Sequence, residues 1–455
     1  MTLDWAVVAH GIAGREDLPI PRQTFFIAAT VVLVASFVGL ATLWQSARLE
    51  VERPERRLLT VPRVLEVLCG AIGIAVFGFL VYAGLEGSQS VPANIVPTSV
   101  HVLFWVGLPV LSLFLGDVFR PFNPWRALGR AGGWLAARIG AGRLPEPLPY
   151  PDRLGWWPAV ASLAAFGWLE NVSTQRDDPS TLAVLALVYA AVQLVGMSLY
   201  GVESWSRRGD GFGVYFRLFA HLSPFHWRER RISLRRPLAG VTRLPAEPGL
   251  VGLVVVAIGV TSFDGFKEGP IWSDVARSFN DVFTGLGLQP GNATTVSFTL
   301  GLLLMLLLVF VLYRLGVAGM RSVDRQRSPT ELARAFAHSL VPIALAYVVA
   351  HYFSLLAYQG QAMAYLISDP LGRGSDVFGT VDQTIDYSVV SANGIWYVQV
   401  GSLILGHVAA LVLAHDRALV FYKDPKKATG SQYWMLAVMV CFTTLGLYLL
   451  SAANE

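Results

Sequence analysis

Four ionisable side chains, two imidazoles and two carboxylates, recur at one end of the apolar segments of this chain. His101 lies in the first turn of one such segment, and His351 lies late in another. Glu170 and Asp264 each lie at the end of a further segment. An ionisable side chain is costly inside a bilayer, so each of the four is a candidate functional residue.

Imidazoles and carboxylates at one depth could perform three kinds of task. They could bind a divalent metal, with His101 and His351 as ligands and Glu170 or Asp264 as a general base. They could relay protons or line a solute pathway. They could also be scattered structural residues, each satisfied by an interhelical hydrogen bond. The residue types alone leave all three open.

Further polar residues extend this candidate site. Tyr352 follows His351, and Gln359 and Gln361 close the same segment on its outer side. His10 lies on the N-terminal tail, and His407 lies deeper, midway along a later segment. These residues are weighed as additional polar members of the site.

The elements that must position these residues are predicted membrane helices. The chain has 455 residues, of which 54% are hydrophobic and only 15% charged, whereas soluble proteins are about one quarter charged. Ten apolar segments approach the ~20 residues that cross ~30 Å of hydrocarbon as a helix. The predicted spans are 24–46, 64–84, 98–117, 154–172, 180–201, 249–265, 295–316, 331–358, 395–416 and 432–452.

The loops between these spans alternate between rich and poor in arginine and lysine. The rich loops are 47–63, 118–153, 202–248, 317–330 and 417–431. Basic loops stay in the cytoplasm, so both termini are predicted outside and the four ionisable residues in the outer third of the membrane. The prediction is an all-α polytopic bundle, one integral domain over 1–455, in a bacterial cytoplasmic membrane.

The formal net charge of +4 follows from this topology. The excess lies on the cytoplasmic face, where anionic lipid attracts it, and nucleic-acid binding is not needed to explain it. Two basic loops, 118–153 and 202–248, also carry helical amphipathic patterns. Asn123 and Pro124 fit a helix N-cap and first position, and aromatic residues follow at helical spacing in the second loop. Both are predicted to be interfacial helices.

The sequence also excludes several classes of chemistry. It contains no Walker A loop, no H-E-x-x-H, no G-x-S-x-G and no C-x-x-C motif. ATP-driven pumping by this chain alone, zincin-type proteolysis and α/β-hydrolase chemistry are therefore not expected. The two cysteines, Cys69 and Cys441, lie within predicted spans, so a disulfide scaffold is not expected either. A divalent metal is the one cofactor that the polar residues could accommodate.

Four stretches of the chain carry a resemblance to a known family. They are HGIAGREDLPIP at 10–21, ANIVPTSVHVLFWVGLPVLSLFLGDVFRPFNPWRAL at 93–128, SFDGFKEGPIW at 262–272 and HSLVPIALAYVVAHYFSLLAYQGQ at 338–361. In these the chain resembles the actinobacterial multi-pass membrane proteins commonly labelled fenitrothion hydrolase. The resemblance implies a membrane-embedded hydrolase of organophosphate-type esters. Its stretches include His101, Asp264 and His351 but not Glu170.

Two functions of different class follow. The first is an outward-facing, metal-assisted hydrolase, in which the metal activates water and polarises a phosphoryl oxygen. The second is a transporter, or a non-catalytic subunit of a membrane complex with partner membrane chains. The absence of a recognisable soluble catalytic domain favours the second, whereas the absence of broken helices in matching halves argues against a carrier.

Overall fold

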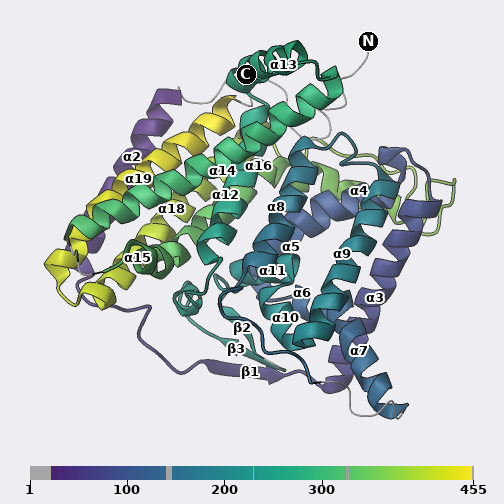
Figure 1. Ribbon diagram of the computed structural model, residues 1–455, viewed down its shortest axis with the longest axis horizontal. Coiled ribbons are helices and arrows are strands. Elements are labelled where there is room, and N and C mark those ends of the chain that lie inside the picture. The colour runs from purple at the N-terminus through teal and green to yellow at the C-terminus, as the bar shows by residue number, and fades with distance from the viewer. Residues whose placement is uncertain (1–21, 140–145, 229, 324, 326, 453–455) are drawn as a thin grey trace.

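The computed structural model describes residues 22–139, 146–228, 230–323, 325 and 327–452. These residues form an all-α bundle with one very small sheet (Figure 1). Within them, nine helical segments are long and apolar enough to cross a membrane, so the protein is a multi-pass membrane protein. The one other predicted span, 154–172, which is the fourth along the chain, corresponds to a helix of only 16 residues, α8 (Trp157–Val172).

Each remaining predicted span coincides with one of the long helical segments. Seven of these segments are single helices: α2 (Arg22–Leu43), α3 (Arg63–Glu86), α9 (Pro179–Tyr200), α12 (Leu250–Lys267), α14 (Pro290–Val323), α18 (Ala392–Tyr422) and α19 (Pro425–Ala452). The eighth is composed of α4 (Ile95–Pro97), η2 (Thr98–Gly107) and α5 (Leu108–Leu115). The ninth is composed of α15 (Pro329–Phe336), η4 (Ala337–Leu340), α16 (Val341–Gln359), η5 (Gly360–Ala362) and α17 (Met363–Leu366). The short helices are η1 (Val91–Ala93), α6 (Phe119–Phe122), α7 (Pro124–Arg138), α10 (Val202–Arg208), α11 (Gly211–Ala220), η3 (Val241–Arg243) and α13 (Pro270–Gly285).

The arginine-rich loops gather on one side of the bundle, which we call the inner side in accordance with the positive-inside rule (Figure 1). Phe37, late in α2, lies 5.3 Å from Tyr433, early in α19, between ring centroids. The two helices are therefore antiparallel neighbours, and the start of α2 and the end of α19 lie on the same side. This is the arrangement expected for termini on one side of the membrane.

A three-stranded antiparallel sheet lies on the inner side and was not predicted. Its strands are β1 (Arg56–Thr60), β2 (Phe225–Arg228) and β3 (Arg231–Leu234), in the order β1-β3-β2. The strands have four or five residues, and the side chains of β1 are all exposed. Such short strands carry no alternating apolar pattern, so they could not be predicted from hydrophobic periodicity. The sheet joins the loop after α2 to the loop before α12.

The aromatic face of α11, a helix predicted to be interfacial, is covered by protein. Its residues Phe212, Tyr215, Phe216 and Phe219 are buried, and the helix packs against α5 and α8. Contact with protein removes an aromatic stripe from water as effectively as contact with lipid does. Here the stripe packs beneath α5. By contrast, α7 keeps an exposed second half, and its Asn123 cap accepts a hydrogen bond from the Arg126 amide at 2.9 Å, as predicted.

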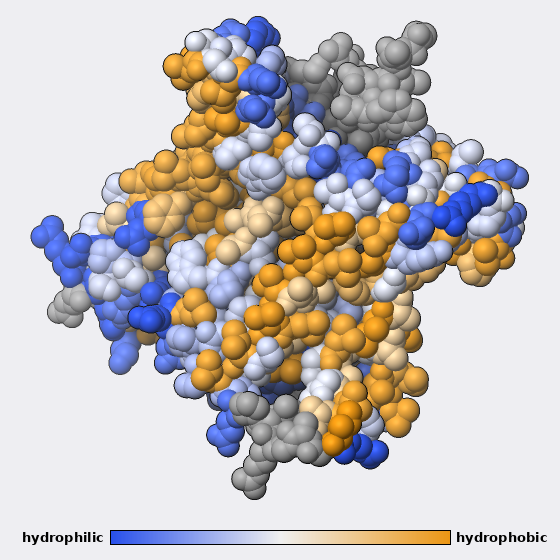
Figure 2. Space-filling model, turned by 45° about the vertical axis from the view of Figure 1, so that its right-hand side comes forward, coloured by the Kyte–Doolittle hydropathy of each residue, from blue (hydrophilic) through white to orange (hydrophobic). Residues whose placement is uncertain are grey.

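The bundle has a buried centre and a lipid-facing periphery. Helices α12 and α16 are buried along most of their length, whereas α2, α3, α9 and α14 expose valine and leucine side chains. Figure 2 shows one face of the molecule, on which hydrophobic residues cover a broad area and hydrophilic residues gather toward the edges. A glycine permits close helix contact near the centre: a Cβ on Gly167 of α8 would meet Val260 of α12 at 2.4 Å.

Candidate functional site

The first element of the site is an unusual helix. Residues Thr98–Gly107 form a ten-residue π-helical stretch, which ends where the Leu108 amide donates to the Leu103 carbonyl. π-Helical geometry is rare, mostly confined to single turns, and frequent at functional sites. This stretch buries His101 and Trp105. Tyr215 of α11 supports it from below, stacked on Trp105 with ring centroids 4.9 Å apart.

His101 forms a tight pair with Glu170, which lies near the outer end of α8. Their Nδ1 and Oε2 atoms are 2.6 Å apart, and both side chains are 10% exposed. His101 Nε2 lies 3.0 Å from the Arg176 carbonyl oxygen. A carbonyl oxygen only accepts, so Nε2 must carry a hydrogen, and the contact with Glu170 then holds one shared proton.

The short 173–178 loop covers this pair from the outer side. Asp177 Oδ1 lies 3.7 Å from His101 Nε2 and is 38% exposed, so it links the pair to solvent. Burial acts to lower the pKa of the Arg176 guanidinium, but Asp177, Glu170 and Asp264 raise it, and the net direction is upward. Arg176 therefore stays cationic beside the acidic residues.

A second cluster surrounds Asp264, which has no exposed side-chain surface. Lys267, one helical turn later in α12, places its Nζ 2.6 Å from Asp264 Oδ1. His351 Nε2 lies 2.8 Å from Asp264 Oδ2, and the Tyr352 hydroxyl donates to the same oxygen at 2.7 Å. One buried carboxylate thus contacts three ionisable side chains, an ammonium, an imidazole and a phenol.

The two clusters form one network. Lys267 Nζ donates to Asn171 Oδ1 at 3.2 Å, and Asn171 follows Glu170 in α8. Glu170 also interacts electrostatically with Asp264 and Lys267. The network therefore runs from the half-exposed Asp177 through His101 and Glu170 to the buried Asp264.

The structure brings together the four residues that lie at one predicted depth. His101 and Glu170 form one pair and Asp264 and His351 another, and Tyr352 joins the second. Lys267, which lies two residues beyond the predicted span 249–265, was not among the residues singled out from the sequence. Its spacing of three residues from Asp264 on a helix was a usable signal for an ion pair.

The predicted metal ligands do not share a ligand set. His101 and His351 contact different carboxylates, and within the described residues no three His, Cys, Asp or Glu side chains are grouped to hold a metal ion. The Lys267 ammonium occupies the position beside Asp264 at which a bound cation would neutralise it. These contacts favour an ammonium over a metal as the countercharge.

Of the additional polar candidates, Tyr352 belongs to this network, whereas Gln361 and His407 make other contacts. Gln361 donates to the Ala357 and Asp386 carbonyls and accepts from the Asp386 amide, which fastens the long outer loop. Gln359 lies at the end of α16, two turns beyond His351. His407 is buried in α18, with Nδ1 2.7 Å from the Leu403 carbonyl. His10 lies outside the described residues.

Comparisons with known proteins add no assignment. Neither a family model, nor a curated protein, nor a solved structure matches the chain.

Proposed function

We propose that this protein moves protons across the membrane in a coupled transport process, with the Asp264 cluster as its proton-exchange site. The carrying observation is that a fully buried carboxylate contacts Lys267, His351 and Tyr352 within 2.6–2.8 Å. All three neighbours are ionisable side chains, so each proton gained or lost by the cluster would change its net charge. Ionisable residues inside membrane proteins commonly form such relays.

The cluster couples protonation to conformation by a simple electrostatic argument. A proton added to Asp264 leaves the Lys267 ammonium without its countercharge, although its side chain is only 5% exposed. Breaking a buried ion pair in this way costs about 3–5 kcal/mol. A movement of α12 or the binding of an anionic solute would relieve that cost. Protonation and movement are therefore linked.

A route toward the inner side lies along the contact between α16 and α18. Within the described residues, His407 Nε2, His338 Nε2 and His415 Nδ1 are buried without a hydrogen-bond partner. The His407 and Tyr347 rings lie 6.4 Å apart between centroids. Tyr347 precedes His351 by one turn on α16, on its inner side. Buried imidazole nitrogens with free capacity suit a stepwise proton path bridged by water.

Proteoliposomes that contain a pH-sensitive dye test this proposal. An imposed membrane potential should drive proton flux in wild type above that of protein-free liposomes. Asp264→Asn and His351→Ala should reduce the flux at least about tenfold, because each removes one proton-exchanging contact. Asp274→Asn is the matched control, since Asp274 is 75% exposed and, among the described residues, its ion pair is with Arg277 one turn away. Equal flux in all four proteins would contradict the proposal.

One observation favours the alternative of outward-facing ester hydrolysis. The His101–Glu170 pair has the geometry of a carboxylate-oriented imidazole, the arrangement used by general bases. Organophosphate triester hydrolysis by the purified protein would support this alternative if His101→Gln and Glu170→Gln both abolished it. Hydrolysis that survives both changes would assign the activity to a contaminant.

A further inference from the structure

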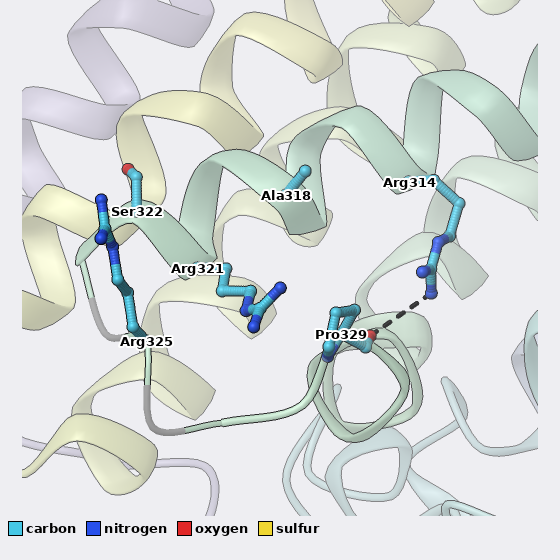
Figure 3. A pocket seen from close by; sticks show the side chains of 6 residues that line it. All are labelled: Arg314, Ala318, Arg321, Ser322, Arg325 and Pro329. Atoms are coloured by element: carbon cyan, nitrogen blue, oxygen red, sulfur yellow. Dashed lines mark hydrogen bonds between the residues drawn. The ribbon is translucent and has the colours of Figure 1, made fainter.

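The inner end of α14 carries a group of arginines that takes no part in the network above. Arg314, Arg321 and Arg325 line a cavity of about 480 Å³ together with Pro329 at the start of α15. Figure 3 shows Arg321 directed into the space between the two helices. Arg314 Nη1 donates to the Pro329 carbonyl at 3.3 Å. Within the described part of the chain, none of the three arginines forms an ion pair with a carboxylate.

The same face of α14 is apolar in the turns above the arginines. Leu304, Leu307, Leu308, Val311 and Leu315 are all exposed there. Leu304, Leu307 and Val311 lead to Arg314, Ala318 and Arg321 at spacings of three and four residues, and Leu308 and Leu315 flank this row on the same side of the helix, so together they form one stripe. The stripe therefore changes from apolar to cationic where the helix leaves the hydrocarbon on the inner side.

We infer that this stripe and cavity bind one anionic phospholipid of the inner leaflet. The arginines would hold the phosphate and anionic headgroup through charge-assisted hydrogen bonds, for which guanidinium is well suited. The acyl chains would lie along the exposed leucines. A free phosphate would use the arginines but leave the apolar part of the stripe unexplained, which is why the lipid is the chosen occupant. Basic pockets on the cytoplasmic side of helices are suited to such headgroups.

The test compares three ligands on protein purified in a neutral detergent. Phosphatidylglycerol should raise the Tm of wild type, whereas phosphatidylcholine and inorganic phosphate should have little effect. Arg321→Ala/Arg325→Ala should bind phosphatidylglycerol at least roughly tenfold more weakly, measured by native mass spectrometry and by the concentration needed for the Tm shift. Arg53→Ala/Arg57→Ala is the control, because it removes the same charge from exposed inner-side residues, one just before β1 and one in β1.

Two results would overturn the inference. The first is a phosphatidylglycerol response that is the same in the double variant and in the control. The second is stabilisation of wild type by inorganic phosphate as strong as that by the lipid, which would assign the cavity to a free anion. If the double variant does not fold, the single change Arg321→Gln and its retained lipid in native mass spectra decide between these outcomes.

Discussion

Asp264 and Asp210 are two carboxylates without exposed surface that differ in the kind of donor around them. Asp210 accepts hydrogen bonds from Asn123 Nδ2 at 2.7 Å, Trp125 Nε1 at 2.8 Å, the Tyr189 hydroxyl at 2.7 Å and the Gly213 amide at 3.1 Å. All of these donors are uncharged at neutral pH. Asp264 instead contacts an ammonium and an imidazole as well as a phenol.

This difference in donors distinguishes a structural carboxylate, which we call an anchor because it holds helices together, from the proposed proton-exchange site. Asp210 caps α11 and ties it to α7 and α9, so its charge is balanced by fixed dipoles that do not change with pH. Asp416 on α18 follows the same rule, because it accepts from the Trp44 indole and from the amides of Arg48, Leu49 and Glu50. Of these three carboxylates, Asp264 is the one whose described contacts include an ammonium and an imidazole.

The largest expected effect comes from removing each carboxylate. Asp210→Ala and Asp264→Ala should each lower the free energy of unfolding by about 3–5 kcal/mol at neutral pH, because each leaves buried partners uncompensated. The cost at Asp264 arises from the Lys267 ammonium left without its countercharge, whereas the cost at Asp210 arises from neutral donors left without an acceptor. Unfolding in detergent at neutral pH measures both.

A double variant provides the control for that experiment. Asp264→Ala/Lys267→Met removes both charges and should recover most of the stability lost in Asp264→Ala, since no buried ion remains. If the double variant is no more stable than Asp264→Ala, then the cost arises from packing and the proposed charge coupling is wrong.

A smaller effect should follow from removing a single hydroxyl at each site. Tyr189→Phe should cost about 1–2 kcal/mol of stability and leave the pH dependence of proton flux unchanged. Tyr352→Phe should cost a similar amount but should also shift the pH dependence of flux, because its hydroxyl contacts the proton-exchanging oxygen. Identical pH profiles in the two variants would remove the distinction between the sites.

The smallest effect is expected at Asp369, an anchor of the Asp210 kind in the outer loop. Partial burial acts to raise the pKa of Asp369, but hydrogen bonds from the Arg373 and Gly374 amides and the Ser375 hydroxyl outweigh it. The pKa therefore lies below its ordinary value of 3.8. The stabilisation is present above that value and is lost as the pH falls through the lowered pKa.

Asp369→Asn should accordingly cost only a few tenths of a kcal/mol, because solvent screens the site. Hydrogen exchange of the Gly374 amide should be faster in the variant than in wild type at neutral pH. The two should converge in acid, where the wild-type carboxyl is protonated. A difference that persists in acid would show that the loop depends on side-chain shape and not on charge.

Loop charges were sufficient to predict the common depth of His101, Glu170, Asp264 and His351, since depth follows from topology. They could not predict which carboxylate meets which imidazole, because that depends on helix rotation and on close contacts such as Gly167 with Val260. The burial of α11 against protein could not be predicted from the sequence either. An aromatic stripe has the same sequence pattern whether it faces lipid or a neighbouring helix.

The π-helical stretch gives the site a mechanical property. Its turns hold more residues than those of an α-helix, so rewinding one turn shifts the register of the residues beside it by one position. One position in an α-helix is a rotation of about 100°. Such a rotation would carry His101 away from Glu170 and the Arg176 carbonyl without moving α8 or α12. A one-residue shift of register within this helix would therefore be enough to make or break the His101 contacts.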